Sequence, residues 1–467
     1  MKSESLLTET YGTKVIRYQQ KNPLRIERIE SKPNIGKNLW LTVAGFFKEI
    51  LLPYGYPDSV STDYFEYQLW DTLQAFCSTI VGSFTTRAIL KGVGVGDAEA
   101  SALSATITWI MKDGSGMIGR IFFAWWKGNM LDCNCKKWRL FADGLNNIAM
   151  LIEIGIPFYS GRSMEILCLT SMMKSIVGIA GGATRASITN HQAKQGNMAE
   201  ISAKDGTQET VVNLFASFTS LYLLSKISNP LYELPFIFLL MILHFYFNFK
   251  AVKCLTFDTL NDSRIVLVLR EYFKNNSLNP SFINSKESVI LGFGLKVSDI
   301  CNFKIKLGSS LRRIVKLFNF QEMEQVLQLY KDKPYLVISD VERKCIYVAL
   351  EKKCEPLEIL RSYVHAVMLA VATCFYNNIP LKVQVIRKRN YTNFVARLET
   401  FMKSINKNTE HYKNMTPSEL KLFNEFVQAE ITMFFVTLNV NEWNSNFHSL
   451  CMEQWKTNWK HGSKKNE

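Results

Sequence analysis

Four short sequence identities occur twice in the same order, and this repetition constrains the fold more than any other feature. The matched strings are Ile80–Gly82 with Ile176–Gly178, Thr86–Ala88 with Thr184–Ala186, Ala98–Ala102 with Ala199–Ala203, and Lys112–Gly114 with Lys204–Gly206. Because four matches in register point to a tandem duplication, the sequence predicts two copies of one helical unit, over about residues 70–131 and 165–225.

The stretch from Asp71 to Lys253 has a helical pattern and many small residues, which favours a bundle of closely packed helices. No charge-free run reaches about 18 residues, the length that indicates a spanning helix outright; the longest, Thr210–Ser225 and Leu234–Phe249, have 16 each. Several spanning helices would therefore have to carry a charge, and with that allowance we favour a membrane-embedded bundle over a soluble one. The best spanning segments are Ile227–Phe249, Val211–Leu224 and Leu145–Tyr159.

Glycines spaced four residues apart let two helices cross closely in a bilayer. Gly178 and Gly182 have this spacing, and Gly82 with Thr86 forms the equivalent pair of small residues. We therefore expect helix crossings at these positions.

The fold class is mainly α, an internally duplicated helical bundle followed by a smaller α+β domain. We divide the chain into a basic N-terminal arm (residues 1–50), the duplicated core (51–255) and a soluble basic C-terminal domain (256–467). Alternation of apolar residues predicts a hairpin of Tyr335–Asp340 and Lys344–Leu350. Further segments expected in this domain are helices at Ile265–Phe273 and Pro356–Phe375 and a strand at Ile431–Val440.

The repeat also duplicates charge, which is costly in apolar surroundings and therefore points to function. Arg87 matches Arg185, and the pair Lys112 and Asp113 matches Lys204 and Asp205. Two arginines and two lysines that converge between the copies could hold a carboxylate or a phosphate. The alternative is structural: each Lys-Asp pair caps a helix and each arginine ties a loop.

Charge and cysteine content limit the classes of partner. The formal net charge of +14 suits an anionic membrane surface or an acidic partner, and no nucleic-acid-binding motif accompanies it, so we expect none. Ten scattered cysteines indicate reduced thiols in an intracellular protein, and we expect no metal site, cofactor or catalytic residue. Trp125, Trp126 and Lys127 are suited to anchoring the chain at a lipid interface.

The core contains four long, unusual strings: LPYGYPDSVSTDYFEYQLWDTLQAFCSTIVG, TRAILKGVGVGDAEAS, TWIMKDGSGMIGRIFFAWWKGNMLDCNCKKWRLFADGLNN and GGATRASITNHQAKQGNMAEISAKDGTQETVVNL. In these strings the chain resembles the root UVB sensitive family. The resemblance implies a membrane- or organelle-associated protein, in a family whose biochemistry is unresolved, and it identifies no catalytic residue.

Together these features predict a non-enzymatic protein of an intracellular membrane. Its two repeats would bind or transport a small anionic ligand at their interface. The alternative is a membrane-anchored adaptor that recruits protein partners through its basic C-terminal domain.

Overall fold

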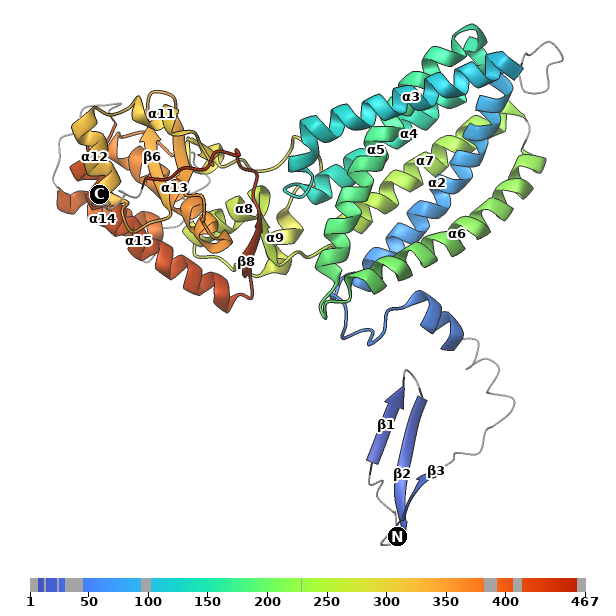
Figure 1. The fold of residues 1–467 in the computed structure, drawn as a ribbon, viewed down its shortest axis with the longest axis horizontal. Helices are drawn as coiled ribbons and strands as arrows, with labels where there is room; N and C mark the ends of the chain where they lie inside the picture. Colours follow the sequence, from blue (N-terminus) through green and yellow to red (C-terminus); the bar gives the residue numbers. More distant parts are fainter. Residues whose placement is uncertain are drawn as a thin grey trace, which may run out of the picture. The chain divides into compact units, whose positions relative to one another are not determined.

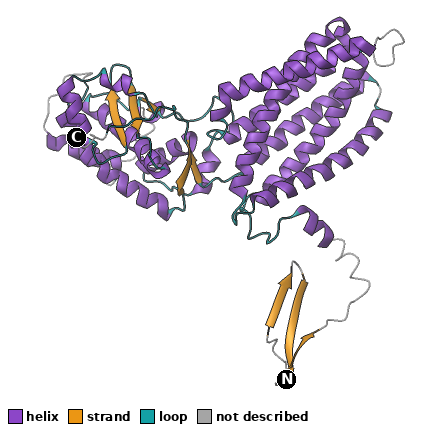
Figure 2. Cartoon of the chain, in the orientation of Figure 1, coloured by secondary structure: helices purple, strands orange, loops and turns teal. Residues whose placement is uncertain are grey.

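The computed structural model describes residues 7–11, 14–22, 25–29, 45–93, 102–227, 229–381, 393–405 and 414–459. The chain is mainly helical with small sheets (Figure 2). It divides into two compact units. The first, the helical unit, comprises Met1–Phe122 with Ala142–Cys254, and the second, the C-terminal unit, comprises Phe123–Phe141 with Leu255–Glu467. The second unit thus includes Phe123–Phe141, which the sequence grouped with the helical core.

The N-terminal arm contains three antiparallel strands in the order β1-β2-β3. They are β1 (Leu7–Tyr11), β2 (Lys14–Asn22) and β3 (Arg25–Ile29).

Six long helices build the helical unit (Figure 1). They are α2 (Tyr64–Gly92), α3 (Ala102–Lys127), α4 (Cys135–Ile154), α5 (Ser163–Gln192), α6 (Met198–Lys226) and α7 (Pro230–Cys254). The end of α3 and the start of α4 belong to the second unit. Short 3-10 turns lie at Gly128–Met130 (η1) and Ile156–Arg162 (η2). Each predicted copy corresponds to a pair of long helices, α2 with α3 and α5 with α6, while the duplication itself stays a prediction.

The core of the helical unit forms where α2 packs against α6 and α7. Its buried residues come from four helices: α2, α4, α6 and α7. These residues are Cys77, Ile80, Val81, Phe84, Met150, Ile154, Ala216, Ile237, Leu240 and Met241.

The expected helix crossings at Gly82, Gly178 and Gly182 are not present in the described part of the chain. A Cβ built on any of these glycines meets no atom within 4 Å. The close crossing occurs instead at Gly119 of α3, whose added Cβ would lie 3.1 Å from the Cα of Met172 in α5. Spacing in sequence identified a residue type that permits close approach, but not the face on which a neighbour lies.

Three described helices are long and apolar enough to cross a membrane: α5, α7 and α13 (Pro356–Tyr376). α7 corresponds to the predicted segment Ile227–Phe249, whereas the other two predicted segments, in α6 and α4, are not among the three. The apolar window of α13 is 89% buried inside the protein, compared with 17% for α5. Packing in the C-terminal core therefore accounts for the apolar character of α13.

A three-stranded sheet organises the C-terminal unit. β7 (Cys345–Leu350) lies between β5 (Lys304–Leu307), its parallel neighbour, and β6 (Tyr335–Asp340), its antiparallel neighbour. The predicted hairpin is thereby confirmed, and α13 packs against the sheet. A second pair of strands, β4 (Thr259–Asn261) and β8 (Asn444–Ser449), is parallel.

Helices surround this sheet, and two of them match the predictions. α8 (Asp262–Phe273) and α13 confirm the helices expected at Ile265–Phe273 and Pro356–Phe375. The others are α9 (Pro280–Lys286), α10 (Ser298–Cys301), α11 (Leu311–Val315), α12 (Phe320–Leu329), α14 (Phe394–Ile405) and α15 (Pro417–Val440).

The strand predicted at Ile431–Val440 is wrong, because these residues form the second half of α15. A capping box between Thr416 and Glu419 starts this helix, with Pro417 in its first turn. Its buried positions then follow helical spacing, at Leu420, Phe423, Val427, Ile431, Phe434 and Leu438. The period of burial along the whole helix outweighs the local preference of its β-branched residues for strands.

A buried ion cluster joins the start of α4 to the rest of the C-terminal unit. Lys136 Nζ lies 3.0 Å from Glu287 Oε2, and Arg264 donates to both Glu287 carboxylate oxygens at 3.1 Å. The three side chains are 2 to 4% exposed. Lys136 also donates to the carbonyl oxygen of Leu255 at 2.7 Å, so each charge is paired and hydrogen-bonded.

Candidate functional site

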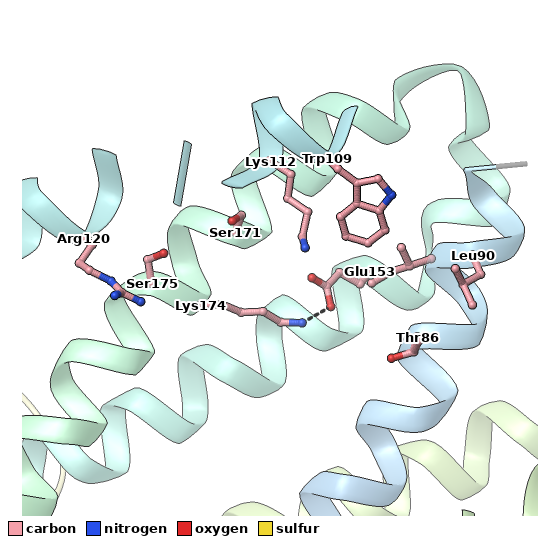
Figure 3. Close-up of a pocket in the computed structure, with 10 residues that line it drawn as sticks. Thr86, Leu90, Trp109, Lys112, Arg120, Glu153, Ser171, Lys174 and Ser175 are labelled. Carbon is pink, nitrogen blue, oxygen red and sulfur yellow. Dashed lines mark hydrogen bonds and ion pairs between the residues drawn. The ribbon is translucent and has the colours of Figure 1, made fainter. Parts of the chain in front are cut away.

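A cavity of about 400 Å³ opens among α2, α3, α4 and α5 within the helical unit (Figure 3). Cavities of this size hold small-molecule ligands. Its lining is Thr86, Ile89 and Leu90 from α2, Trp109, Lys112 and Arg120 from α3, Glu153 from α4, and Ser171, Lys174 and Ser175 from α5. Residues from both predicted copies thus share one cavity.

The charges around this cavity are unbalanced. Lys112, Arg120 and Lys174 are cationic, and Glu153 is the one carboxylate among the lining residues. Lys174 Nζ donates to Glu153 Oε2 at 2.5 Å, and the Glu153 side chain is only 1% exposed. That pair is neutral as a whole, and Lys112 Nζ lies 3.8 Å from the carboxylate of Asp113, which does not line the cavity. Arg120 forms no ion pair among the residues that the structure describes, so its charge favours an anionic ligand.

Two glycines set the distance between α3 and α5 beside the cavity. A Cβ on Gly116 would lie 2.6 Å from Ser171 Oγ and 2.9 Å from Ser175 Oγ. Gly119 makes the close approach to Met172 one turn further along α3. The two glycines therefore let α3 lie close to α5 beside the cavity.

Trp109 supplies the aromatic part of the site, and Lys112 lies over its ring. Lys112 Nζ lies 4.2 Å from the centroid of the Trp109 ring, and 3.8 Å from Asp113 Oδ1. Figure 3 shows Lys112 reaching from α3 toward Glu153 and Lys174. The site therefore combines cationic donors, serine hydroxyl groups and an indole ring, a set suited to a small molecule with a phosphate or carboxylate group and a flat apolar part.

Of the six residues predicted to bind the ligand, Lys112 lines this cavity. Arg87 instead pairs with Glu233 of α7 and donates to the carbonyl oxygen of Ile227 at 3.4 Å. Arg87 thus ties the start of α7 to α2, as the structural alternative expected of an arginine at this position.

The second predicted set lies on α5 and α6. Arg185 donates to Asp205 Oδ2 at 2.6 Å and to Glu209 Oε2 at 2.8 Å. Lys204 donates to the carbonyl oxygen of Glu49 at 2.5 Å. These residues, and Asp113, are not among those that line the cavity; a ligand-binding role for them stays a prediction.

The residues predicted as an interface anchor lie at the end of α3. Trp125 is 80% exposed and Trp126 57% exposed, and Lys127 Nζ lies 4.4 Å from the centroid of the Trp126 ring. Large exposed indole rings next to a cation suit a lipid interface, and anchoring by these residues stays a prediction.

Sequence reasoning missed Arg120, Glu153 and Lys174. The available signal was the one used for the repeats, a charged residue within a long apolar helix. That signal singled out only charged residues repeated at the same position in both predicted copies, and none of these three is repeated. Only the packing of α3, α4 and α5 brings them together.

Two family models match the chain in succession. The first, described as "Vitamin B6 photo-protection and homoeostasis domain", matches residues 37–276, and the second, "Root UVB sensitive protein, C-terminal", matches residues 276–459. The chain belongs to the root UVB sensitive family. The first model contains the whole candidate cavity, and the second contains most of the C-terminal unit.

Relatives within the family occur in a slime mould and in a plant. "RUS family member 1" of Dictyostelium discoideum is 44% identical over 63% of this chain and 56% of its own length. "Protein root UVB sensitive 3" of Arabidopsis thaliana is 33% identical over 75% of this chain and 80% of its own length. "Protein root UVB sensitive 2, chloroplastic" is 25% identical over 71% of this chain. No solved structure matches the chain.

Proposed function

We propose that the helical unit is embedded in a membrane and binds a small anionic ligand in the cavity between α2, α3, α4 and α5, as a carrier or receptor without catalytic activity. The single observation behind this proposal is the set of three cationic side chains, Lys112, Arg120 and Lys174, around a cavity with one lining carboxylate. Lys174 and Lys112 each have one carboxylate partner, and the three cationic groups gathered at one cavity still attract an anion.

The apolar surface of the helical unit supports membrane embedding. α3, α6 and α7 expose many large apolar side chains, each between about two fifths and three quarters exposed. Examples are Ile110, Ile118 and Ile121 on α3, Phe215, Phe218 and Leu221 on α6, and Leu231, Leu239 and Ile242 on α7. Many large apolar side chains exposed on three helices of one unit indicate a lipid or protein environment rather than water.

The description of the matching family model suggests which anion to test. It connects the domain with vitamin B6, and the phosphorylated forms of this vitamin combine a phosphate group with a flat aromatic ring. Arg120 and the lysines would hold the phosphate, and Trp109 would face the ring. We therefore propose a phosphorylated B6 vitamer as the ligand.

Binding of pyridoxine 5′-phosphate to the full-length protein in detergent, measured by calorimetry, tests the ligand proposal. Lys112→Gln and Arg120→Gln should each weaken binding about tenfold or more, because each removes a charge-assisted contact. Lys226→Gln and Arg162→Gln are matched controls, since both side chains are exposed on the same unit and neither lines the cavity. Equal affinities for all four variants, or no binding by the unmodified protein, would refute the proposal.

Alkaline carbonate extraction of cell membranes tests the embedding separately. An embedded helical unit should stay in the membrane pellet, because its apolar faces on α3, α6 and α7 lie in the hydrocarbon region. Full release into the supernatant would contradict embedding and would favour a peripheral protein.

A further inference from the structure

A second cavity, of about 470 Å³, lies within the C-terminal unit between the start of β6, the first turns of α13 and the middle of α15. Its lining combines ionised, polar and aromatic groups, among them Lys333, Tyr335, Glu358, Arg361, Gln428 and Phe435. The cavity is built entirely from residues outside the helical unit, so it is independent of the anion site proposed above.

A chain of buried hydrogen bonds fixes the polarity of the cavity floor. Tyr330 donates to the carbonyl oxygen of Val337 at 2.8 Å, so its oxygen must accept from Asn424 Nδ2, also at 2.8 Å. Asn424 Oδ1 then accepts from His365 Nε2 at 2.8 Å, which makes His365 Nδ1 the acceptor for Gln428 Nε2 at 3.1 Å. The direction of the whole chain of hydrogen bonds is fixed at one end by the backbone carbonyl group of Val337, which can only accept.

This order of donors and acceptors leaves two groups of the cavity lining for a ligand, the hydroxyl hydrogen of Tyr335 and the amide oxygen of Gln428. Gln428 Nε2 also donates to the Tyr335 hydroxyl oxygen at 3.5 Å, so the hydroxyl hydrogen of Tyr335 is available for a ligand. The amide oxygen of Gln428 points away from the nitrogen that His365 binds and can accept a hydrogen bond. His365 is fully buried, and desolvation lowers its pKa to about 3, so the imidazole stays neutral and the chain keeps this direction.

Lys333 is an unusual lysine for a cavity wall. It forms no ion pair with a carboxylate among the residues that the structure describes, and its Nζ lies 5.6 Å from the centroid of the Tyr330 ring. Burial lowers its pKa to about 8, although Glu358 acts in the opposite direction. At pH 7, Lys333 is therefore a neutral, nucleophilic amine in roughly a tenth of the molecules, far more than for a lysine of ordinary pKa.

Arg361 supplies a site for an anionic group beside this amine. Its Nη1 donates to Glu358 Oε1 at 2.6 Å, and its guanidinium carbon lies 5.7 Å from the centroid of the Phe435 ring. A guanidinium has five N–H donors, so pairing with one carboxylate leaves donors for a ligand. The side chain is 42% exposed, so that an incoming anion can reach it.

We propose that this cavity binds a small carbonyl compound with an anionic group, which Arg361 holds while Lys333 forms a reversible imine with the carbonyl carbon. The neutral amine of Lys333 adds to the carbonyl carbon, and the carbonyl oxygen, hydrogen-bonded by Tyr335, becomes a hydroxyl group. The nitrogen loses its two protons, one to that oxygen when it becomes the hydroxyl and one when the hydroxyl leaves as water. The products are one imine and one water molecule, with no change in oxidation state.

Reductive trapping on the full-length protein tests this proposal, with pyruvate as the anionic probe and acetaldehyde as the neutral one. Cyanoborohydride converts an imine into a stable secondary amine, which peptide mass spectrometry locates. Pyruvate should label Lys333 at least tenfold faster than the exposed neighbour Lys331, an internal control in the same chain. Labelling that follows exposure, with Lys331 ahead of Lys333, would overturn the proposal.

Two variants test the separate roles. Lys333→Arg should remove the label at this position while leaving labelling of Lys331 unchanged. Arg361→Gln should slow pyruvate labelling of Lys333 about tenfold and leave acetaldehyde labelling within twofold, because only pyruvate carries a carboxylate. An equal loss with both probes would overturn the role of Arg361 as the anion site.

Discussion

Replacement of Glu287 by glutamine should strongly destabilise the C-terminal unit. Glu287 is the only carboxylate that pairs with both Lys136 and Arg264 in the described cluster, at 3.0 and 3.1 Å. Glutamine keeps the size of the side chain but removes its charge. The two cations then remain buried without a counter-charge, which is far more costly than the loss of a surface ion pair.

The structure gives the magnitude of this effect. Burial alone would raise the pKa of Glu287, but Arg264 and Lys136 outweigh it and lower the pKa from 4.5 to about 2. This lowering of the pKa corresponds to about 3 kcal/mol of stabilisation at neutral pH. This agrees with the roughly 3–5 kcal/mol lost when one partner of a buried pair is removed.

Hydrogen exchange measured by mass spectrometry provides the assay, because it reports opening of a particular helix. Amides of α8, which carries Arg264, should exchange about 100-fold faster in Glu287→Gln than in the unmodified protein. Glu453→Gln is the matched control. It breaks a more exposed pair with Arg313, and should change exchange of α8 less than threefold. Exchange of α8 within threefold of the unmodified protein in Glu287→Gln would refute this reasoning.

The stability of the unmodified protein and that of Glu287→Gln should also differ in their dependence on pH. The folded pKa of Glu287 is lowered, so its stabilisation is complete above about pH 5 and is lost as the pH falls toward about 2. The difference in unfolding free energy between the unmodified protein and Glu287→Gln should therefore shrink over this range. Urea unfolding followed by tryptophan fluorescence measures it, and a constant difference would contradict the assignment.

Three further substitutions have clear expected outcomes. Gly308→Ala should lower the unfolding free energy by more than about 2 kcal/mol, because φ is +70° and the new Cβ would lie 2.2 Å from a backbone oxygen. Gly292→Ala is its control: φ is +85° but the space is open, so only the roughly 1–2 kcal/mol of the left-handed conformation should be lost. Thr416→Ala should cost about 1 kcal/mol by removing the N-cap of α15, as urea unfolding can show. Gly119→Val should lower the melting temperature of the helical unit much more than Gly114→Val, which meets nothing within 4 Å.

Local sequence signals predicted elements that are apolar and buried along most of their length. The hairpin of β6 and β7 and the helices α8 and α13 follow from alternation or from long apolar runs. Ile431–Val440 failed because a short β-branched segment, taken alone, fits a strand, while its helical period becomes visible only over the full length of α15. α13 is equally instructive, since its composition fits a membrane span and its environment is a protein core.

The sequence by itself determined the family, the mainly helical architecture and the presence of charges in apolar helices, because motifs, periodicity and charge are properties of neighbouring residues. It singled out Lys112, which lines the candidate cavity, but it could not find Arg120, Glu153 and Lys174, which come from three different helices. Nor could it show that Arg185 pairs with Asp205. Those results were decided by the tertiary structure, since which charges meet depends on the faces along which helices pack.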